Sequence, residues 1–248
     1  MKDFCLALAR KQKSSAAGRN AMREYLQAYI LRILHEEGVF RHAAFIGGTA
    51  LRFLHELPRF SEDLDFSCAA RPDVSFSDLV KKIRDECLLA GYTVSVSYND
   101  EKTVRHAFVK FAGLLYEAGL SPLKEQNLSV KIELDTNPPA GAVFQTKIVN
   151  KFFPIAFLSH DIPSLFSGKI HALLSRKYVK GRDFFDLGWY LSRWKNLAPN
   201  IQLLRNSLLQ TGWRKKLPEE ETWRSLLTRI VIKTDWHKVA KDVEPFLE

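Results

Sequence analysis

The sequence predicts an α+β protein in two parts, a mixed-sheet domain over residues 1–160 and a helical domain over residues 161–248. Apolar and polar residues alternate over residues 92–98, 104–111 and 128–135, as they do in half-buried strands. After Phe157 the apolar residues recur at helical spacing instead. Asp161 followed by Pro163 is a typical helix start, so the helical part is expected to begin near residue 160.

The elements of the first part follow from local signals. Apolar residues at helical spacing predict an amphipathic helix that ends at Gly38, after which short apolar runs alternate with glycine and proline breaks. The expected elements before residue 92 are a helix over 20–37 in an N-terminal helical region, a strand over 43–46, a helix over 50–57, a strand over 59–67 and a helix over 76–90. The result is a mixed sheet covered by helices.

Composition and charge narrow the class of partner. The 248 residues are 46% hydrophobic and 26% charged, which is typical of a folded protein. The net charge of +9 favours a polyanionic partner, and the basic residues are spread along the chain, which favours a nucleic acid over a membrane. We find no apolar run of about 18 residues that would span a bilayer and no secretory signal, so we expect a cytoplasmic protein. Three widely spaced cysteines predict neither disulfides nor a zinc site.

Two aspartates lie one residue apart on the strand expected over residues 59–67. Because side chains alternate along a strand, Asp63 and Asp65 share one face while Leu64 and Phe66 point to the core. Two carboxylates about 7 Å apart, with a third nearby, can hold two divalent ions in the geometry that phosphoryl transfer uses. Mg²⁺ is the expected ion because it prefers oxygen ligands and shares them with substrate phosphates.

A glycine pair precedes the acidic strand. Gly47, Gly48 and Thr49 follow a short strand and open a helix, so bare backbone N–H groups and a hydroxyl are available to a phosphate. The spacing matches neither the GxxxxGK[ST] phosphate loop nor the GxGxxG dinucleotide fingerprint. We therefore expect a nucleotide-phosphate site of another kind.

The order Gly47-Gly48-Thr49, thirteen residues, then Asp63-Leu64-Asp65 resembles the signature of the nucleotidyltransferase superfamily. More narrowly, GGTALR followed by RFSEDLDF resembles the AbiEii/AbiGii toxins, to which the MenT toxins also belong. The resemblance implies a nucleotidyltransferase-like fold and an enzyme that uses an NTP, releases pyrophosphate and acts in a bacterial toxin–antitoxin system. It also implies a cognate antitoxin encoded nearby and, from MenT-like relatives, a tRNA 3′ end as acceptor.

A third carboxylate is expected on the strand over residues 128–135. Alternation places Lys131, Glu133 and Asp135 on one face. The superfamily carries a third metal ligand on such a strand, and the pattern Lys-apolar-acid-apolar favours Glu133. Asp135 stays open as the alternative.

The helical half carries SGKIHALLSRKYVKGRDFFDL, which resembles the later motifs of the same family. The resemblance assigns Lys169 and Arg176 to the nucleotide and Asp183 to the catalytic site. Seven residues separate the two cations, so we expect both on one helix face, where they could reach a triphosphate. Asp183 is expected in the first turn of the next helix, where the helix dipole favours a carboxylate.

The prediction for the whole chain is an Mg²⁺-dependent nucleotidyltransferase toxin that transfers NMP to tRNA and arrests growth, its helical domain completing the active-site cleft. Two alternatives stay open: transfer to a small molecule or a protein hydroxyl, and a nucleotide- or RNA-binding module without catalysis. The expected metal ligands are Asp63, Asp65 and Glu133; the catalytic residues are Asp63, Asp65, Lys169 and Asp183; and the nucleotide-binding residues are Gly47, Gly48, Thr49, Arg52, Lys169 and Arg176.

Overall fold

The structure, a computed structural model, describes residues 1–70, 75–176 and 178–248. They form two compact units. The sheet unit comprises residues 1–137 and 146–159 together with residue 248, and the helical unit comprises residues 138–145 and 160–247. The division into domains at residue 160 stays a prediction, since the helical unit also takes in a segment from before that residue.

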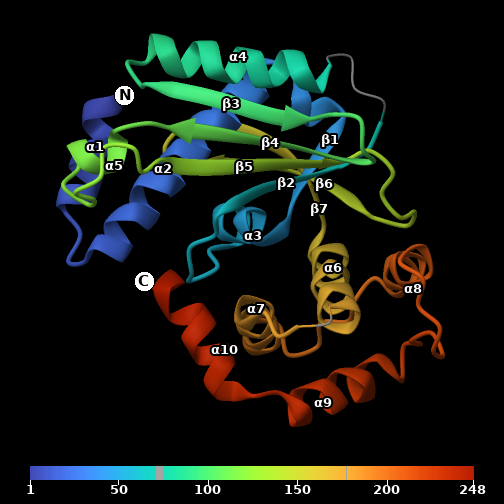
Figure 1. Ribbon diagram of the computed structural model, residues 1–248. Helices are drawn as coiled ribbons and strands as arrows, with labels where there is room; N and C mark the ends of the chain where they lie inside the picture. Colours follow the sequence, from blue (N-terminus) through green and yellow to red (C-terminus); the bar gives the residue numbers. More distant parts are fainter. Residues whose placement is uncertain (71–74, 177) are drawn as a thin grey trace. The chain divides into compact units, whose positions relative to one another are not determined.

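The sheet unit begins with two helices, and further helices lie between some of its strands along the chain (Figure 1). Its elements are α1 (Lys2–Arg10), α2 (Ser15–Glu36), η1 (Val39–Arg41), β1 (Ala43–Ile46), α3 (Gly47–His55), β2 (Asp63–Cys68), α4 (Phe76–Leu89), β3 (Val94–Asn99), β4 (Val104–Phe111), α5 (Leu114–Glu117) and β5 (Leu128–Asp135). Two more strands, β6 (Phe144–Asn150) and β7 (Pro154–His160), lie mostly in this unit.

The strands form one mixed sheet, which has seven strands in the described part of the chain, in the order β3-β4-β5-β2-β1-β7-β6. β2 lies between β1, to which it is antiparallel, and β5, to which it is parallel. β1 also pairs in parallel with β7, through Phe45 and Ser159. The mixed sheet with its helices confirms the predicted α+β fold class.

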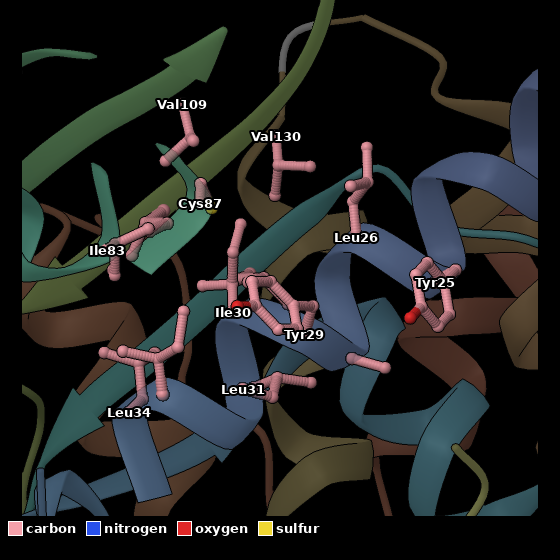
Figure 2. Packing of buried hydrophobic residues seen from close by; sticks show 14 of the residues in the cluster. Tyr25, Leu26, Tyr29, Ile30, Leu31, Leu34, Ile83, Cys87, Val109 and Val130 are labelled. Carbon is pink, nitrogen blue, oxygen red and sulfur yellow. The ribbon is translucent and has the colours of Figure 1, made fainter. Parts of the chain in front are cut away.

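The core of the sheet unit lies between α2, α4 and one face of the sheet. Figure 2 shows side chains of α2 packed among those of α4, β4 and β5. Leu26 and Ile30 of α2 and Val130 of β5 are inaccessible to solvent. Along β5 every second residue is buried, so the polar residues Lys131, Glu133 and Asp135 lie on the opposite face. This alternation is the one that the sequence predicts.

Three elements begin three or more residues away from the predicted position. The helix expected from residue 20 begins at Ser15, because Ser14 caps it by accepting a hydrogen bond from the Ala17 N–H. The helix expected from residue 50 begins at Gly47, so the glycine pair forms its first turn. The strand expected from residue 59 begins at Asp63, because Gln27 of α2 donates hydrogen bonds to the two carbonyls that precede it.

β6 and β7 were not predicted. β7 carries the apolar run around Phe157, which the sequence places just before the helical part. Its pairing partner β1 lies more than a hundred residues earlier in the chain. Such a pairing leaves no local pattern in the sequence.

The helical unit is built from α6 (Ile162–Ser175), α7 (Gly181–Arg193), α8 (Ile201–Gln210), α9 (Trp223–Lys233), α10 (Trp236–Val243) and η2 (Glu244–Phe246) (Figure 1). Asp161 caps α6 by accepting a hydrogen bond from the Ser164 N–H, and Pro163 lies in the first turn, as predicted. Phe166 is inaccessible to solvent and packs against Tyr190 of α7 and Trp223 of α9. None of the helices within the described ranges is both long and apolar enough to cross a bilayer.

Candidate active site

The glycine pair and the acidic strand meet at the first residue of α3. Gly47 has a φ of +77°, and a methyl group added to it would lie 2.2 Å from Asp65 Oδ2 and 3.0 Å from Asp65 Cγ. Both the left-handed backbone and the contact exclude a side chain at this position. Gly47 therefore allows the Asp65 carboxylate to approach the N-terminus of α3 directly.

Gly48 makes room for two polar side chains in the same way. A methyl group on it would lie 2.8 Å from Ser61 Oγ and 2.9 Å from a terminal guanidinium nitrogen of Arg59. Arg59 is 2% exposed and donates a hydrogen bond to the Phe60 carbonyl. The N-terminus of α3 is thus approached by an acid, a hydroxyl and a guanidinium, each through the space of a missing Cβ.

Thr49 and Gln27 hold the start of β2. The Thr49 hydroxyl is fully buried and donates to the backbone carbonyl of Asp63. The buried Gln27 amide donates to the carbonyls of Ser61 and Glu62, at 3.0 and 2.8 Å. Three consecutive carbonyls are therefore fixed by two side chains, which sets where the strand carrying the aspartates begins. In this structure Thr49 acts on the protein backbone, and its nucleotide-binding role stays a prediction.

Asp63, Asp65 and Glu133 share a sheet face with a lysine, Lys131. The parallel register sets Asp63 opposite Lys131 and Asp65 opposite Glu133. The Lys131 ammonium lies 2.7 Å from Glu133 Oε1. Partial burial lowers the pKa of Lys131, but the hydrogen bond that its ammonium donates to Glu133 and the charges of Glu133, Asp63 and Asp65 outweigh it, so the pKa is raised. The face thus combines the carboxylates of Asp63, Asp65, Glu133 and Asp135 with the Lys131 ammonium.

The donor chemistry of this face fits a hard divalent ion. Asp63 and Asp65 offer only oxygen ligands, and Mg²⁺ is usually held by one or two carboxylates together with waters and substrate phosphates. Within the described ranges, no three His, Cys, Asp or Glu side chains are grouped so that they could hold a metal on their own. Glu133, the expected third ligand, is instead paired with Lys131.

Arg52 lies in α3, with its side chain buried. Its guanidinium is 2.6 Å from Glu24 Oε1, donates to the Leu57 carbonyl at 3.0 Å and lies over the Phe60 ring. Lys151 contacts the same Glu24 oxygen at 2.7 Å. These partners give Arg52 a role in holding α2 and α3 together, and its predicted contact with a nucleotide stays a prediction.

In the helical unit, Lys169 of α6 lies between two acids of α7. Its ammonium is 2.6 Å from Asp186 Oδ2 and 3.4 Å from Asp183 Oδ1. The Asp186 side chain is inaccessible to solvent, and that of Asp183 is 4% exposed. A buried carboxylate is costly without a partner, so Asp186 is a fixed anchor for the lysine. Burial of Tyr190 on α7, together with the charge of Asp186, raises the pKa of the Tyr190 hydroxyl.

Arg176 does not lie on the helix face that carries Lys169, contrary to the prediction. α6 ends at Ser175, and Arg176 has extended backbone geometry as its C-cap residue. The next helix, α7, begins at Gly181 and packs against α6. Arg176 nevertheless joins the cluster, since its Nε is 3.3 Å from Asp183 Oδ2. Asp183 lies in the first turn of α7, as predicted.

Three residues of these sites were not assigned a role from the sequence. Asp186 follows Asp183 by three residues on a helix, a spacing that would have placed both acids on one face. Lys131 was placed on the acid face but given no function. Gln27 lies in an apolar stretch of α2, and no local pattern marks it as the residue that holds the start of β2.

A glycine-opened helix beside a paired-aspartate strand, on a mixed sheet followed by helices, defines a nucleotidyltransferase-like protein. The family model described as "Nucleotidyl transferase AbiEii toxin, Type IV TA system" matches residues 29–248. The chain therefore belongs to the AbiEii family of nucleotidyltransferase toxins of type IV toxin–antitoxin systems. Membership implies a nucleotide substrate and an antitoxin partner.

Two solved structures from Helicobacter pylori are similar over nearly the whole chain. The crystal structure of JHP933 shares 19% identity, covers 91% of this chain and 93% of its own, and has a TM-score of 0.44. A second, titled "putative nucleotidyltransferase from H. pylori", shares 20% identity, with coverages of 90% and 95% and the same TM-score. At this likeness neither structure bears on the activity. No curated protein matches the chain.

Proposed function

We propose that this toxin transfers NMP from an NTP to the 3′ end of tRNA in the cytoplasm, releases pyrophosphate and thereby arrests growth. The observation that carries the proposal is the contact of Gly47 with the Asp65 carboxylate at the start of α3. It brings an acid that suits a divalent ion beside a helix N-terminus that suits a phosphate. The family supports nucleotidyl transfer, and the net charge of +9 supports an RNA acceptor.

In this proposal Asp63, Asp65 and Glu133 hold Mg²⁺, in a two-ion site. The bound ions would lower the pKa of the acceptor hydroxyl and offset charge on the phosphates. Backbone N–H groups of Gly47 and Gly48 would bind phosphate oxygens, because the N-cap residue Ile46 has no side chain that caps the helix.

The other proposed nucleotide-binding residues are Thr49, Arg52, Lys169 and Arg176. Lys169 would offset the charge that develops on the phosphates during transfer. Asp183 would act in the same reaction by orienting Lys169, which its carboxylate contacts at 3.4 Å. Both residues belong to the helical unit. Substitution of either one, followed by the transfer assay described next, would test its role.

The test is incubation of the purified protein with each α-labelled NTP, Mg²⁺ and total tRNA. We expect label on tRNA, and an Asp65→Asn variant should lose roughly 10³-fold in rate because a neutral amide holds a metal poorly. Asp85→Asn is the matched control, because Asp85 is an exposed acid on α4 paired only with a neighbouring arginine in the described contacts. Label on a protein or a small molecule, or none at all, would refute the tRNA proposal.

Growth provides the second test. Regulated expression in a bacterial host should arrest growth for the wild type and for Asp85→Asn, and co-expression of the product of the neighbouring reading frame should relieve the arrest. Arrest by Asp65→Asn equal to that by the wild type would mean that toxicity does not depend on nucleotidyl transfer.

A further inference from the structure

Lys131 is the one cation that the register places among the predicted metal ligands within the described part of β2 and β5. It lies opposite Asp63, and its ion-pair partner Glu133 lies opposite Asp65. Both members of the pair are about one-third exposed, at 30% and 31% of the side chain. An incoming cation would therefore reach this pair from solvent without unfolding the sheet.

The position of the ammonium is set by the strands on both sides of β5. Towards β4, Phe108 is the register partner of Lys131, and the ammonium lies 5.8 Å from the centre of its ring. Towards β2, the register partner is Asp63. Because side chains two residues apart share a strand face, the pair with Glu133 runs along β5 beside the aspartates.

We propose that the Lys131 ammonium is an internal counter-ion of this carboxylate face, and that a divalent cation must displace it from Glu133 in order to bind. The proposal rests on the proposed function, because it takes Asp63, Asp65 and Glu133 as the metal ligands. Three carboxylates on neighbouring strands repel one another when no cation is present. The lysine offsets that repulsion in the metal-free protein, and the same positive charge opposes the entry of a metal ion.

The test is to measure Mn²⁺ binding in the absence of nucleotide. Binding is monitored as the loss of the free-ion signal in electron paramagnetic resonance. Lys131→Met should bind Mn²⁺ about tenfold more tightly, the size expected for removing a unit charge roughly 6 Å from a divalent ion in water-like surroundings. Lys81→Met is the matched control, since Lys81 pairs with Asp78 on α4 at 3.2 Å and its loss changes the net charge equally. The control should bind Mn²⁺ as the wild type does.

Melting temperature gives an independent readout. Mn²⁺ should raise the melting temperature of Lys131→Met more than that of the wild type, because a tighter ligand stabilises the folded state more. If the methionine variant does not fold, Lys131→Gln removes the same charge with a polar side chain suited to a one-third-exposed position.

Two outcomes would overturn the proposal, and they differ in what else they refute. Unchanged or weaker Mn²⁺ binding by Lys131→Met and Lys131→Gln, with binding abolished in Asp65→Asn, would refute the counter-ion role and leave the metal site standing. Mn²⁺ binding that Asp65→Asn does not weaken would refute the metal site and the counter-ion together.

Discussion

Replacement of Gly47 by alanine should damage the active site and the fold through two separable effects. The added methyl group would lie 2.2 Å from Asp65 Oδ2, so the carboxylate must move by an ångström or more. The backbone must also hold a φ of +77°, which costs alanine about 1–2 kcal/mol. Together with about 1–3 kcal/mol for the forced displacement, we expect a loss of about 2–5 kcal/mol in the free energy of unfolding.

Gly91→Ala separates the two effects. Gly91 has a φ of +88° but open space where its methyl group would be. The free energy of unfolding of Gly91→Ala should therefore fall only by the cost of the left-handed backbone, about 1–2 kcal/mol. In urea denaturation Gly47→Ala should be the less stable variant, and in the transfer assay it should lose roughly 10²-fold in rate, as misplacement of a reacting group by about 1 Å does. Gly91→Ala should keep its rate.

A double-mutant cycle makes the reasoning refutable. On an Asp65→Ala background the contacts of the new methyl group with Asp65 Oδ2 and Cγ are gone and only that with Asp65 Cβ, at 3.1 Å, remains. Gly47→Ala should then cost little more than the backbone term, and a coupling of about 1–3 kcal/mol should appear. Additive losses in the cycle, or a Gly47→Ala enzyme as active as Gly91→Ala, would show that the glycine does not serve the approach of Asp65.

Three further predictions concern the fold around the sites. Gly181→Ala places a methyl group 2.3 Å from a carbonyl oxygen of α10, so its free energy of unfolding, measured by urea denaturation, should fall by about 1–3 kcal/mol. Gly188→Ala, on the same helix but with open space around the methyl group, should instead gain about 0.5–1 kcal/mol. Equal effects of the two substitutions would contradict the contact. Thr49→Val should lose about 0.5–1.5 kcal/mol in the free energy of unfolding, because it removes the hydrogen bond to the Asp63 carbonyl. Thr49→Ser keeps that hydrogen bond and most of the stability, and a serine variant as unstable as the valine variant would argue against the role of the hydroxyl. Burial lowers the pKa of His160 from 6.5 to about 4, so between these pH values the histidine is protonated in the unfolded chain but neutral in the folded one. The free energy of unfolding should therefore fall by up to about 3 kcal/mol between pH 6.5 and 4. His160→Gln should remove most of that fall, and an unchanged pH dependence would refute the assignment.

The local patterns of the sequence predict much of the sheet. The strand from Leu128 alternates strictly and the strand from Val104 does so in part, and both appear with the expected bounds. The cap at Asp161 was equally predictable, because it depends on neighbouring residues alone. The register that sets Asp65 opposite Glu133 needs two segments far apart in the chain, so only the structure supplies it.

The candidate site residues, too, are predictable from the sequence only in part. The motif identified Asp63, Asp65 and Gly47 as candidate residues, but the reason for Gly47, its contact with the Asp65 carboxylate, is a matter of tertiary packing. The prediction that Lys169 and Arg176 share one helix is wrong, because α6 ends at Ser175 and residue spacing does not show where a helix ends. The boundaries of an element are harder to predict from sequence than the element itself.

The strand order has a consequence for synthesis of a chain that belongs to a toxin family. β2 gains its second neighbour only when residues 128–135 have left the ribosome, and β1 remains an edge until β7 follows. At roughly 5–20 residues per second, the aspartates spend several seconds on an unfinished sheet. Since the carboxylate face requires β5, a nascent or truncated chain that ends before it lacks Glu133 and Lys131 altogether. The timing of translation thus separates the synthesis of the two aspartates from the completion of the carboxylate face around them.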